Sequence, residues 1–266
     1  MSQIDGNMIV RGNTTVQYQS SIYTPSPIVY LKMNDGSGTT ASDSSSAGNN
    51  LNGTLGGDAS WTSTKYKNGP YAVEFDGTGD YIDLGTSTTL KPNIAMTIAA
   101  WVYADDFGSG FAAILSCWPG SGAESNYSFF LGTGDSGAGN GKVDWLVMKH
   151  PAGGSGTWLQ TDSAELTAEQ WHHVAVTYSG ANTRMRIYID GSLKDATHVR
   201  EAVPSQISQG SHNVGIGLNY NGSASYPYPW DGAIDELSMW DVELTADQIS
   251  YLYGGGVVPD VSKGIP

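Results

Sequence analysis

Short runs of β-branched and aromatic residues, separated by turn-forming residues, dominate the chain between residues 28 and 240. Each run is bounded by Gly, Asn, Asp, Ser or Pro, a pattern typical of strands joined by tight turns. No long helical periodicity lies between the runs, which excludes α/β architectures and leaves an all-β sandwich or barrel. The predicted strands are IVYLKM (28–33), YAVEF (71–75), MTIAAWVYA (96–104), YSFFLG (127–132), VDWLVM (143–148), HHVAVTY (172–178), RMRIYID (184–190), NVGIGL (213–218) and AIDELSMW (233–240).

Alternation within these runs predicts which side chains share a face. In HHVAVTY, His172 lies on one face and His173 on the other, so the two histidines cannot act as a catalytic pair. Asp190-Gly191 between apolar positions predicts a tight hairpin. We expect five residues to be largely buried on the inward faces of the sheets: Trp101, Val174, Val176, Ile187 and Ile189.

Two segments carry a Thr followed three residues later by Gln, the spelling of a capping box: LTAEQW (166–171) and LTADQISYLY (244–253). The first predicts one helical turn, and the second predicts a short C-terminal helix that stops at the glycines after Tyr253. Residues 1–27 are polar with scattered apolar positions, which predicts an extended arm. The expected organisation is an arm (1–27), a sandwich (28–254) and a tail (255–266).

The composition favours short strands and many turns over disorder. Glycine accounts for 35 of the 266 residues, and charged residues for 14%, against roughly 25% in average soluble proteins. The net charge of −14 makes nucleic acid and anionic membranes poor partners, and it suits cations and neutral ligands. The sole cysteine, Cys117, lies in an apolar run and predicts a buried, inert thiol. We expect neither a signal peptide nor a membrane span, because no suitable apolar run occurs.

WHHVAVTYSGANTRMRIYIDG (171–191) contains Trp-x-His-Val-Ala followed by Tyr-x-Asp-Gly. Together with other motifs in order along residues 28–254, it resembles the signature of the concanavalin A-like, laminin-G-like jelly-roll domain family. VEFDGTGDYIDLG (73–85) and DGAIDELSMWDVELTADQISYLY (231–253) are similar to its Asp-Gly strand pair and to its closing strand and helix. The resemblance implies an antiparallel jelly-roll β-sandwich. It does not specify a function, because this fold hosts lectins, glycosidases, adhesion modules and virion proteins.

The sequence shows no clear pair of carboxylates suited to glycoside hydrolysis. Such an enzyme needs two carboxylates ~5 to 9 Å apart that face the same way. Glu74 and Asp76 have a suitable spacing, but Asp76 enters a turn. Asp235 and Glu236 are adjacent in a predicted strand and should point to opposite faces. We therefore expect a protein that is not an enzyme.

The resemblance implies a structural calcium near the two ends of the domain. Calcium prefers carboxylate, amide and main-chain oxygens. The loop that contains Asp43 and Asn49 supplies such oxygens, and the resemblance adds Asp235 from the closing strand. Asp43 and Asp235 should then lie close together. Alternatively, Asp43 and Asn49 only stabilise turns through their side chains.

Ligand binding is expected on loops. NYNGSASYPYPW (219–230) concentrates aromatic rings suited to sugars, which need a flat apolar surface beside polar groups. Trp118 and Trp158 are further candidates. Alternatively, these rings cap the rim of the sandwich or pack between subunits, and Trp230 belongs to the core. The predicted carbohydrate-binding residues are Tyr220, Tyr226, Tyr228 and Trp230.

Two functions remain open. The first is a non-catalytic binding or structural module on the surface of a virus or phage particle, with possible carbohydrate binding or host adhesion. A fold typical of extracellular proteins on a chain without a recognisable secretion signal favours it. The arm over residues 1–27 would contact other subunits of an assembly. The second is a glycan-active bacterial enzyme or its carbohydrate-binding module, exported by another route.

Overall fold

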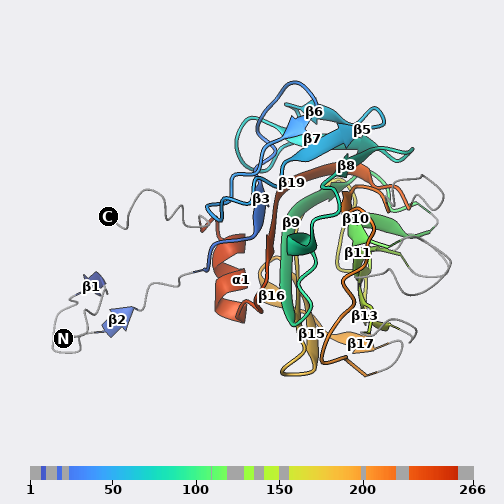
Figure 1. The fold of residues 1–266 in the computed structure, drawn as a ribbon. Helices are drawn as coiled ribbons and strands as arrows, with labels where there is room; N and C mark the ends of the chain where they lie inside the picture. Colours follow the sequence, from blue (N-terminus) through green and yellow to red (C-terminus); the bar gives the residue numbers. More distant parts are fainter. Residues whose placement is uncertain are drawn as a thin grey trace.

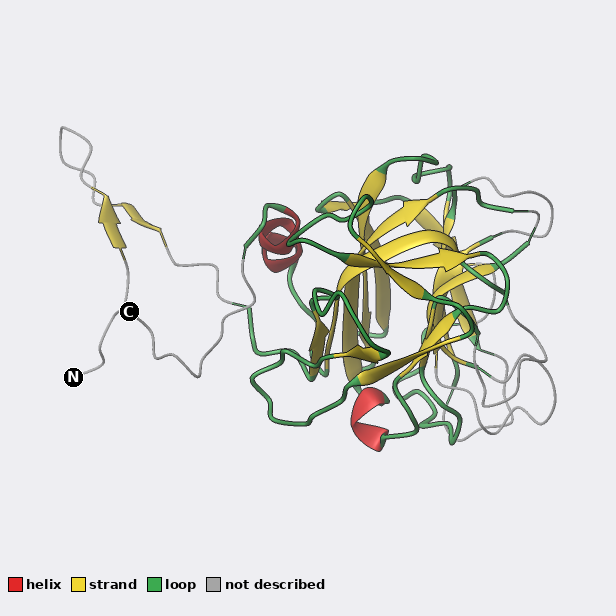
Figure 2. Cartoon of the chain, turned by 90° about the horizontal axis from the view of Figure 1, so that it is seen from above, coloured by secondary structure: helices red, strands yellow, loops and turns green. Residues whose placement is uncertain are grey.

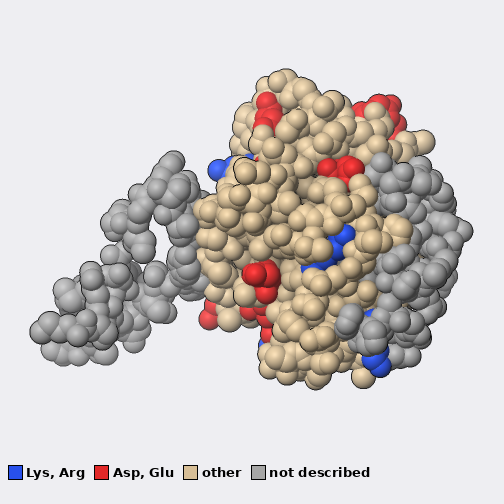
Figure 3. Space-filling view, in the orientation of Figure 1, with Lys and Arg blue, Asp and Glu red and all other residues tan. Residues whose placement is uncertain are grey.

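The computed structural model describes residues 7–9, 17–19, 24–108, 110–118, 129–134, 141–149, 156–198, 202–219 and 228–256. Within these residues the chain forms two large antiparallel sheets that pack face to face, together with one α-helix (Figures 1 and 2). The predicted all-β sandwich with a short C-terminal helix is confirmed. The face of the molecule in Figure 3 is largely uncharged and carries small, separate acidic and basic groups, as expected from few charged residues.

One sheet has nine strands in the spatial order β17-β13-β12-β11-β10-β18-β8-β5-β4. In chain order they are β4 (Thr40–Ala41), β5 (Gly53–Gly56), β8 (Tyr81–Asp83), β10 (Ala112–Cys117), β11 (Phe129–Thr133), β12 (Val143–Val147), β13 (Thr157–Thr161), β17 (Ala196–His198) and β18 (Gly215–Ile216).

The other sheet has eight strands, of which seven follow the order β16-β15-β14-β9-β19-β7-β6, while β3 also pairs with β19. In chain order they are β3 (Val29–Leu31), β6 (Ser60–Thr62), β7 (Ala72–Asp76), β9 (Ala95–Ala104), β14 (Trp171–Ser179), β15 (Arg184–Ile189), β16 (Ser192–Leu193) and β19 (Asp231–Trp240). A short 3₁₀ helix, Thr88–Leu90, precedes β9. Every strand pair in both sheets is antiparallel, as expected for chains that return through short turns.

Two further strands, β1 (Asn7–Ile9) and β2 (Gln17–Gln19), pair with each other. They lie in the region predicted to be an extended arm. The rest of residues 1–23 lies outside the described residues, as do the tail residues 257–266.

The core fills the space between the two large sheets. Val174, Val176, Ile187 and Ile189 are at most 1% exposed and belong to this core, as alternation predicted. The chain reverses between β15 and β16 at Asp190 and Gly191, whose φ angles of 50° and 74° are those of a tight hairpin turn. Cys117 is buried, as expected.

Helix α1 (Ala246–Tyr253) covers the outer face of the eight-stranded sheet (Figure 1). Thr245 and Gln248 form the predicted capping box at its first turn. A second hydrophobic cluster joins the helix to the strands beneath it: Ala99, Ala175, Tyr188, Trp240, Leu244, Ile249 and Leu252. The central strands β9, β14 and β19 are therefore buried on both faces.

The helix over the outer face explains one wrong expectation. Trp101 is buried, with 6% exposed, but its ring contacts Tyr253 of α1 at a centroid distance of 5.6 Å. It therefore lies on the outward face of β9, and its inward placement was wrong. In the sequence Trp101 looks like a residue of the core between the sheets, because α1 covers an outer face that would otherwise be exposed to solvent.

The helical turn expected over residues 166–171 was also wrong. The Glu169 N–H donates to the carbonyl of Ala104 (2.8 Å), and the Thr167 N–H donates to Nε2 of His172 (3.0 Å). These amides bond to β9 and β14, so they do not form a helical ladder. His172 also contacts the Asp190 carboxylate through Nδ1 at 2.8 Å, which fastens the start of β14 to the hairpin.

Candidate functional site

A cluster of aromatic rings lies on the outer side of the nine-stranded sheet. The rings come from both ends of β10, from β11 and β13, and from the segment before β19, and neighbouring centroids lie 5.4–6.3 Å apart. We call this cluster the aromatic face. It consists of Phe111, Trp118, Phe130, Trp158 and Tyr228.

Strand alternation directs these rings away from the core. Phe129 and Leu131 belong to the core, so Phe130 between them points outward. Leu159 belongs to the core as well, which directs its neighbour Trp158 outward. Phe130 is 2% exposed, whereas the other four rings of the aromatic face are half-buried. The face therefore offers a ligand four partly accessible rings above a buried one.

A buried carboxylate orients part of the aromatic face. Asp144 of β12 is 1% exposed, and its Oδ1 accepts hydrogen bonds of 2.8 Å from Nε1 of Trp158 and from Nε2 of Gln160. Gln160 also donates to the carbonyl of Gly134 at 3.3 Å. The hydrogen bond from Nε1 to this buried acceptor holds the Trp158 ring in one orientation.

Two of the predicted binding residues, Tyr228 and Trp230, lie in the segment before β19, and their side chains point in different directions. The carbonyl of Tyr228 accepts the N–H of Ala113 (2.8 Å), and the N–H of Trp230 donates to the carbonyl of Gly217 (2.8 Å). Tyr228 joins the aromatic face, whereas Trp230 is 1% exposed and belongs to the core. The Trp230 ring is therefore not available to a ligand. Tyr220 and Tyr226 lie outside the described residues.

The residues expected around a calcium ion have the following partners. Oδ1 of Asp43 accepts the N–H of Tyr30 (3.1 Å) and of Ser45 (2.8 Å), and its Oδ2 accepts the N–H of Leu51 (3.0 Å). Asn49 donates from Nδ2 to the carbonyl of Ile28 at 2.9 Å. These contacts match the turn-stabilising alternative for Asp43.

Asp235 has a different environment. Its side chain is fully buried, and Oδ2 accepts the N–H groups of Lys67 (2.8 Å) and Asn68 (2.9 Å). Oδ1 has no hydrogen-bond partner within the described part of the chain. Burial raises the pKa of this carboxyl to about 7. An orphaned buried carboxylate oxygen is costly unless another ligand satisfies it, which fits a cation here.

A β-bulge changes the expected directions of the acidic pair in β19. The pairing of β19 with β9 shifts between Asp235 and Ser238, and Glu236 has a φ of 55°. Ile234 and Leu237 both belong to the core, so neither acid between them points inward. The expectation that Asp235 and Glu236 point to opposite faces was therefore wrong.

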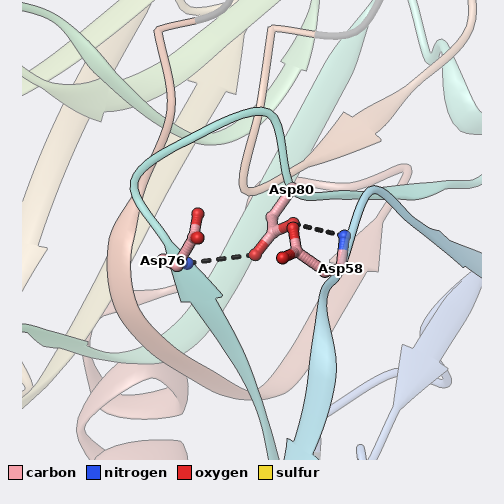
Figure 4. Close-up of side chains that lie close together, drawn as sticks. All are labelled: Asp58, Asp76 and Asp80. Carbon is pink, nitrogen blue, oxygen red and sulfur yellow. Dashed lines mark hydrogen bonds between the residues drawn. The ribbon is translucent and has the colours of Figure 1, made fainter.

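Three other aspartates lie close together among the described residues. They are Asp58, Asp76 and Asp80, and one carboxylate oxygen from each lies within 4.8 Å of those of the other two (Figure 4). The carboxylate of Asp80, which is 2% exposed, accepts the backbone N–H of Asp58 (2.7 Å) and of Asp76 (3.0 Å). Burial raises the pKa of Asp80.

These aspartates line a hollow of about 330 Å³, here called the acidic hollow. Its other lining residues include Glu74, Asp105 and Asp231. Among the described residues, Lys65 is the cation that pairs with these acids, bridging Glu74 (2.7 Å) and Asp105 (2.5 Å). The remaining carboxylates concentrate negative charge that a divalent cation could offset. The short Asp-Gly-Thr-Gly-Asp spelling at 76–80 was the only sequence signal for this cluster, and Asp58 is remote in sequence.

Comparison with known proteins gives the family and the fold. A family model described as the concanavalin A-like lectin/glucanases superfamily matches residues 76–250. The rat sushi, von Willebrand factor type A, EGF and pentraxin domain-containing protein 1 is 31% identical over 87 residues, which are 31% of this chain and 2% of that protein. The C-reactive protein of Xenopus laevis is 32% identical over 87 residues, which are 31% of this chain and 35% of that protein. The chain thus spans only a small part of these relatives.

Solved structures show the same fold at low sequence identity. Domain 4 of AbnA, an extracellular arabinanase from Geobacillus stearothermophilus determined in complex with arabinotriose, has a TM-score of 0.60 and 19% identity, covering 86% of this chain and 98% of that one. The ligand-binding domain of botulinum neurotoxin serotype D, determined in complex with N-acetylneuraminic acid, has a TM-score of 0.57 and 17% identity, covering 86% of this chain and 51% of that one. Among the described residues, no helix has the length and apolar character needed to cross a membrane.

Proposed function

Because the chain belongs to the concanavalin A-like lectin/glucanases superfamily, we propose that it is a non-catalytic module that binds carbohydrate through the aromatic face. The observation that carries the proposal is the convergence of four half-buried rings with Gln160 and the buried Asp144. Apolar ring faces suit the C–H surfaces of sugars, and adjacent polar groups suit their hydroxyls. Two structural neighbours of low identity were determined with saccharides bound, which supports the same ligand class.

The arrangement favours binding over hydrolysis. Glycosidases use two carboxylates that flank the scissile bond. Asp144 provides a carboxylate near the aromatic face, among the residues that the structure describes. Its Oδ1 already accepts hydrogen bonds from two N–H groups. The alternative, a glycan-active enzyme, would release reducing sugar from a polysaccharide that the protein retains.

Replacing Tyr228 or Trp118 with alanine should weaken retention on the polysaccharide that binds best. Retention is measured by affinity electrophoresis or a pull-down on a panel of polysaccharides that includes arabinan. We expect at least a tenfold loss, about 1.4 kcal/mol, because a stacked aromatic ring is a dominant contact. Tyr66→Ala removes an exposed tyrosine outside the aromatic face and is the matched control. Retention that survives both replacements would place the binding site elsewhere.

Calcium is part of the proposal, with Asp235 as the buried ligand group. Its orphaned Oδ1 fits a cation, and the ion would stabilise the fold by binding only the native state. A chelator should then lower the melting temperature, and excess calcium should restore it. Asp235→Asn should abolish this response. If Asp80→Asn abolishes it while Asp235→Asn does not, the ion lies in the acidic hollow. An unchanged melting temperature in chelator would refute both sites.

The finer assignment, to the surface of a virus or phage particle, depends on the N-terminal arm. Strands β1 and β2 pair with each other in this region, and the edge of a two-stranded sheet can add to a sheet of another chain. Deleting residues 2–24 should leave a folded, soluble sandwich that no longer assembles, as measured by circular dichroism and light scattering. A truncated chain that unfolds would show that the arm belongs to the domain. One that assembles normally would remove the main support for a virion component.

A further inference from the structure

A partly enclosed pocket lies beside α1, on the outer face of the eight-stranded sheet and away from the aromatic face. Its volume is about 300 Å³, at the lower end of the range for small-molecule sites. Tyr30, Lys32, Trp101, His173, Glu236 and Ser238 contribute polar or aromatic groups to its lining. We call it the helix pocket.

His173 lines this pocket, and its Nδ1 is buried in the pocket wall. The side chain is 3% exposed, and within the described part of the chain its Nδ1 has no hydrogen-bond partner. Burial lowers the pKa of His173 to about 4, so the imidazole is neutral near pH 7. A neutral imidazole offers one donor and one acceptor. An uncompensated buried nitrogen of this kind indicates a missing partner.

Glu236 and Lys32 add an acceptor and a donor. One carboxylate oxygen of Glu236 accepts the hydroxyl of Tyr30, and the other has no hydrogen bond among the described residues. The Lys32 ammonium lies 5.6 Å from the centroid of the Tyr30 ring and has no salt bridge within the described residues. The opposite charges of Glu236 and Lys32 offset each other. Ser238, which is 3% exposed, contributes a hydroxyl.

The indole of Trp101 is not free for stacking. The Lys67 ammonium lies 3.9 Å from the indole centroid, and the Tyr253 ring lies 5.6 Å from it. A flat aromatic ligand would therefore gain little in this pocket. The lining of the helix pocket provides both hydrogen-bond donors and hydrogen-bond acceptors.

We propose that the helix pocket binds a small, neutral, hydroxyl-rich ligand about the size of one sugar ring. Hydroxyls both donate and accept, so one ligand of this class can bond to Glu236, Lys32 and Ser238 together while it packs against His173. The offsetting charges of the pocket disfavour an ion of either sign. A free monosaccharide and the end residue of a glycan present the same hydroxyls. This site is separate from the aromatic face and does not depend on it.

The test titrates the full-length protein with glucose, galactose, mannose, arabinose and N-acetylglucosamine, and with acetate and methylammonium as charged probes. Calorimetry or saturation-transfer NMR measures binding. We expect at least one neutral sugar to bind and neither ion to do so. Glu236→Gln should weaken binding about tenfold, because it replaces a charged hydrogen-bond acceptor. Ser238→Ala should weaken it severalfold. Glu169→Gln, at an exposed position, is the matched control.

Three results would overturn the proposal. One is the absence of binding by any of the sugars. Another is binding that neither Glu236→Gln nor Ser238→Ala alters, because the sugar then binds elsewhere, including the aromatic face. The third is binding only after the chain is shortened to end at Gly256, which would mean that the chain's own tail occupies the pocket. Ser238→Ala keeps the test decisive if Glu236→Gln unfolds, because it removes a single oxygen atom.

Discussion

Replacing Val176 with aspartate should prevent the chain from folding. Val176 lies at the centre of β14, where it pairs with Ile187 on one side and Ile98 on the other. Its side chain is fully buried in the core between the sheets. An unpaired carboxylate there would cost several kcal/mol, a large part of a typical stability of about 5–15 kcal/mol. Circular dichroism and the soluble yield should show an unfolded or insoluble protein.

Val242→Asp is the matched control for this change. Val242 is 38% exposed, so the same substitution there leaves the carboxylate in water. We expect its effect on the free energy of unfolding to stay within about 0.5 kcal/mol. If Val176→Asp folds with the stability of Val242→Asp, the inward face assigned to β14 is incorrect.

Alternation predicted the long strands well because every second side chain along β9 and β14 belongs to the core between the sheets. Val174 and Val176 alternate with residues of the opposite face, and a one-residue shift would move both from the core between the sheets to the outer face beneath α1. Short strands escaped prediction. β4 has two residues and β17 has three, which is too few for a period of two to be visible. Neighbouring strands, not intrinsic propensity, hold these segments in place.

The two wrong expectations for the outer face of the eight-stranded sheet each have a structural cause. The direction of Glu236 depends on a bulge, which inserts a residue without a recognisable sequence signal. The burial of Trp101 from outside depends on α1, which follows β19 in the chain and packs back over the sheet. Sequence patterning predicted the helix but not the face that it covers.

The candidate site was predicted only in part, for a similar reason. Tyr228 was identified from its aromatic-rich loop, and the structure places it beside Trp118. Phe111 and Phe130 were missed, because an isolated aromatic residue in or beside a strand reads as core. Only the pairing of β10 with β11 brings these two rings together.

His173 links the packing of α1 to the pH dependence of stability. Its ring lies between two aromatic rings, 5.3 Å from Trp101 and 6.2 Å from Tyr253 of the helix. Burial is the main cause of its low pKa, about 4, and Lys67 lowers the pKa further, whereas Asp190 raises it. A protonated His173 would place a positive charge beneath α1.

The folded protein should therefore lose stability as the pH falls from about 6.5 towards 4. The unfolded chain has an ordinary histidine pKa near 6.5 and binds a proton in this window, whereas the folded protein does not. The stability that depends on neutral His173 is fully present above about pH 6.5 and is lost as the pH falls below it. For a shift of this size the loss is of the order of 2–3 kcal/mol near pH 4.

His173→Phe isolates this contribution, because phenylalanine keeps an aromatic ring beneath α1 and removes the proton-binding group. Asp235, whose pKa is raised to about 7, has the opposite effect: its contribution falls as the pH rises through that range. Asp235 is present in both proteins, so it cancels when the variant is compared with the parent. Melting temperatures in chelator at pH 7, 6, 5 and 4 provide the comparison. The parent should lose stability relative to His173→Phe at each step below pH 6.5. Parallel pH profiles would show that His173 is accessible to protons in the folded protein and that α1 does not seal it from water.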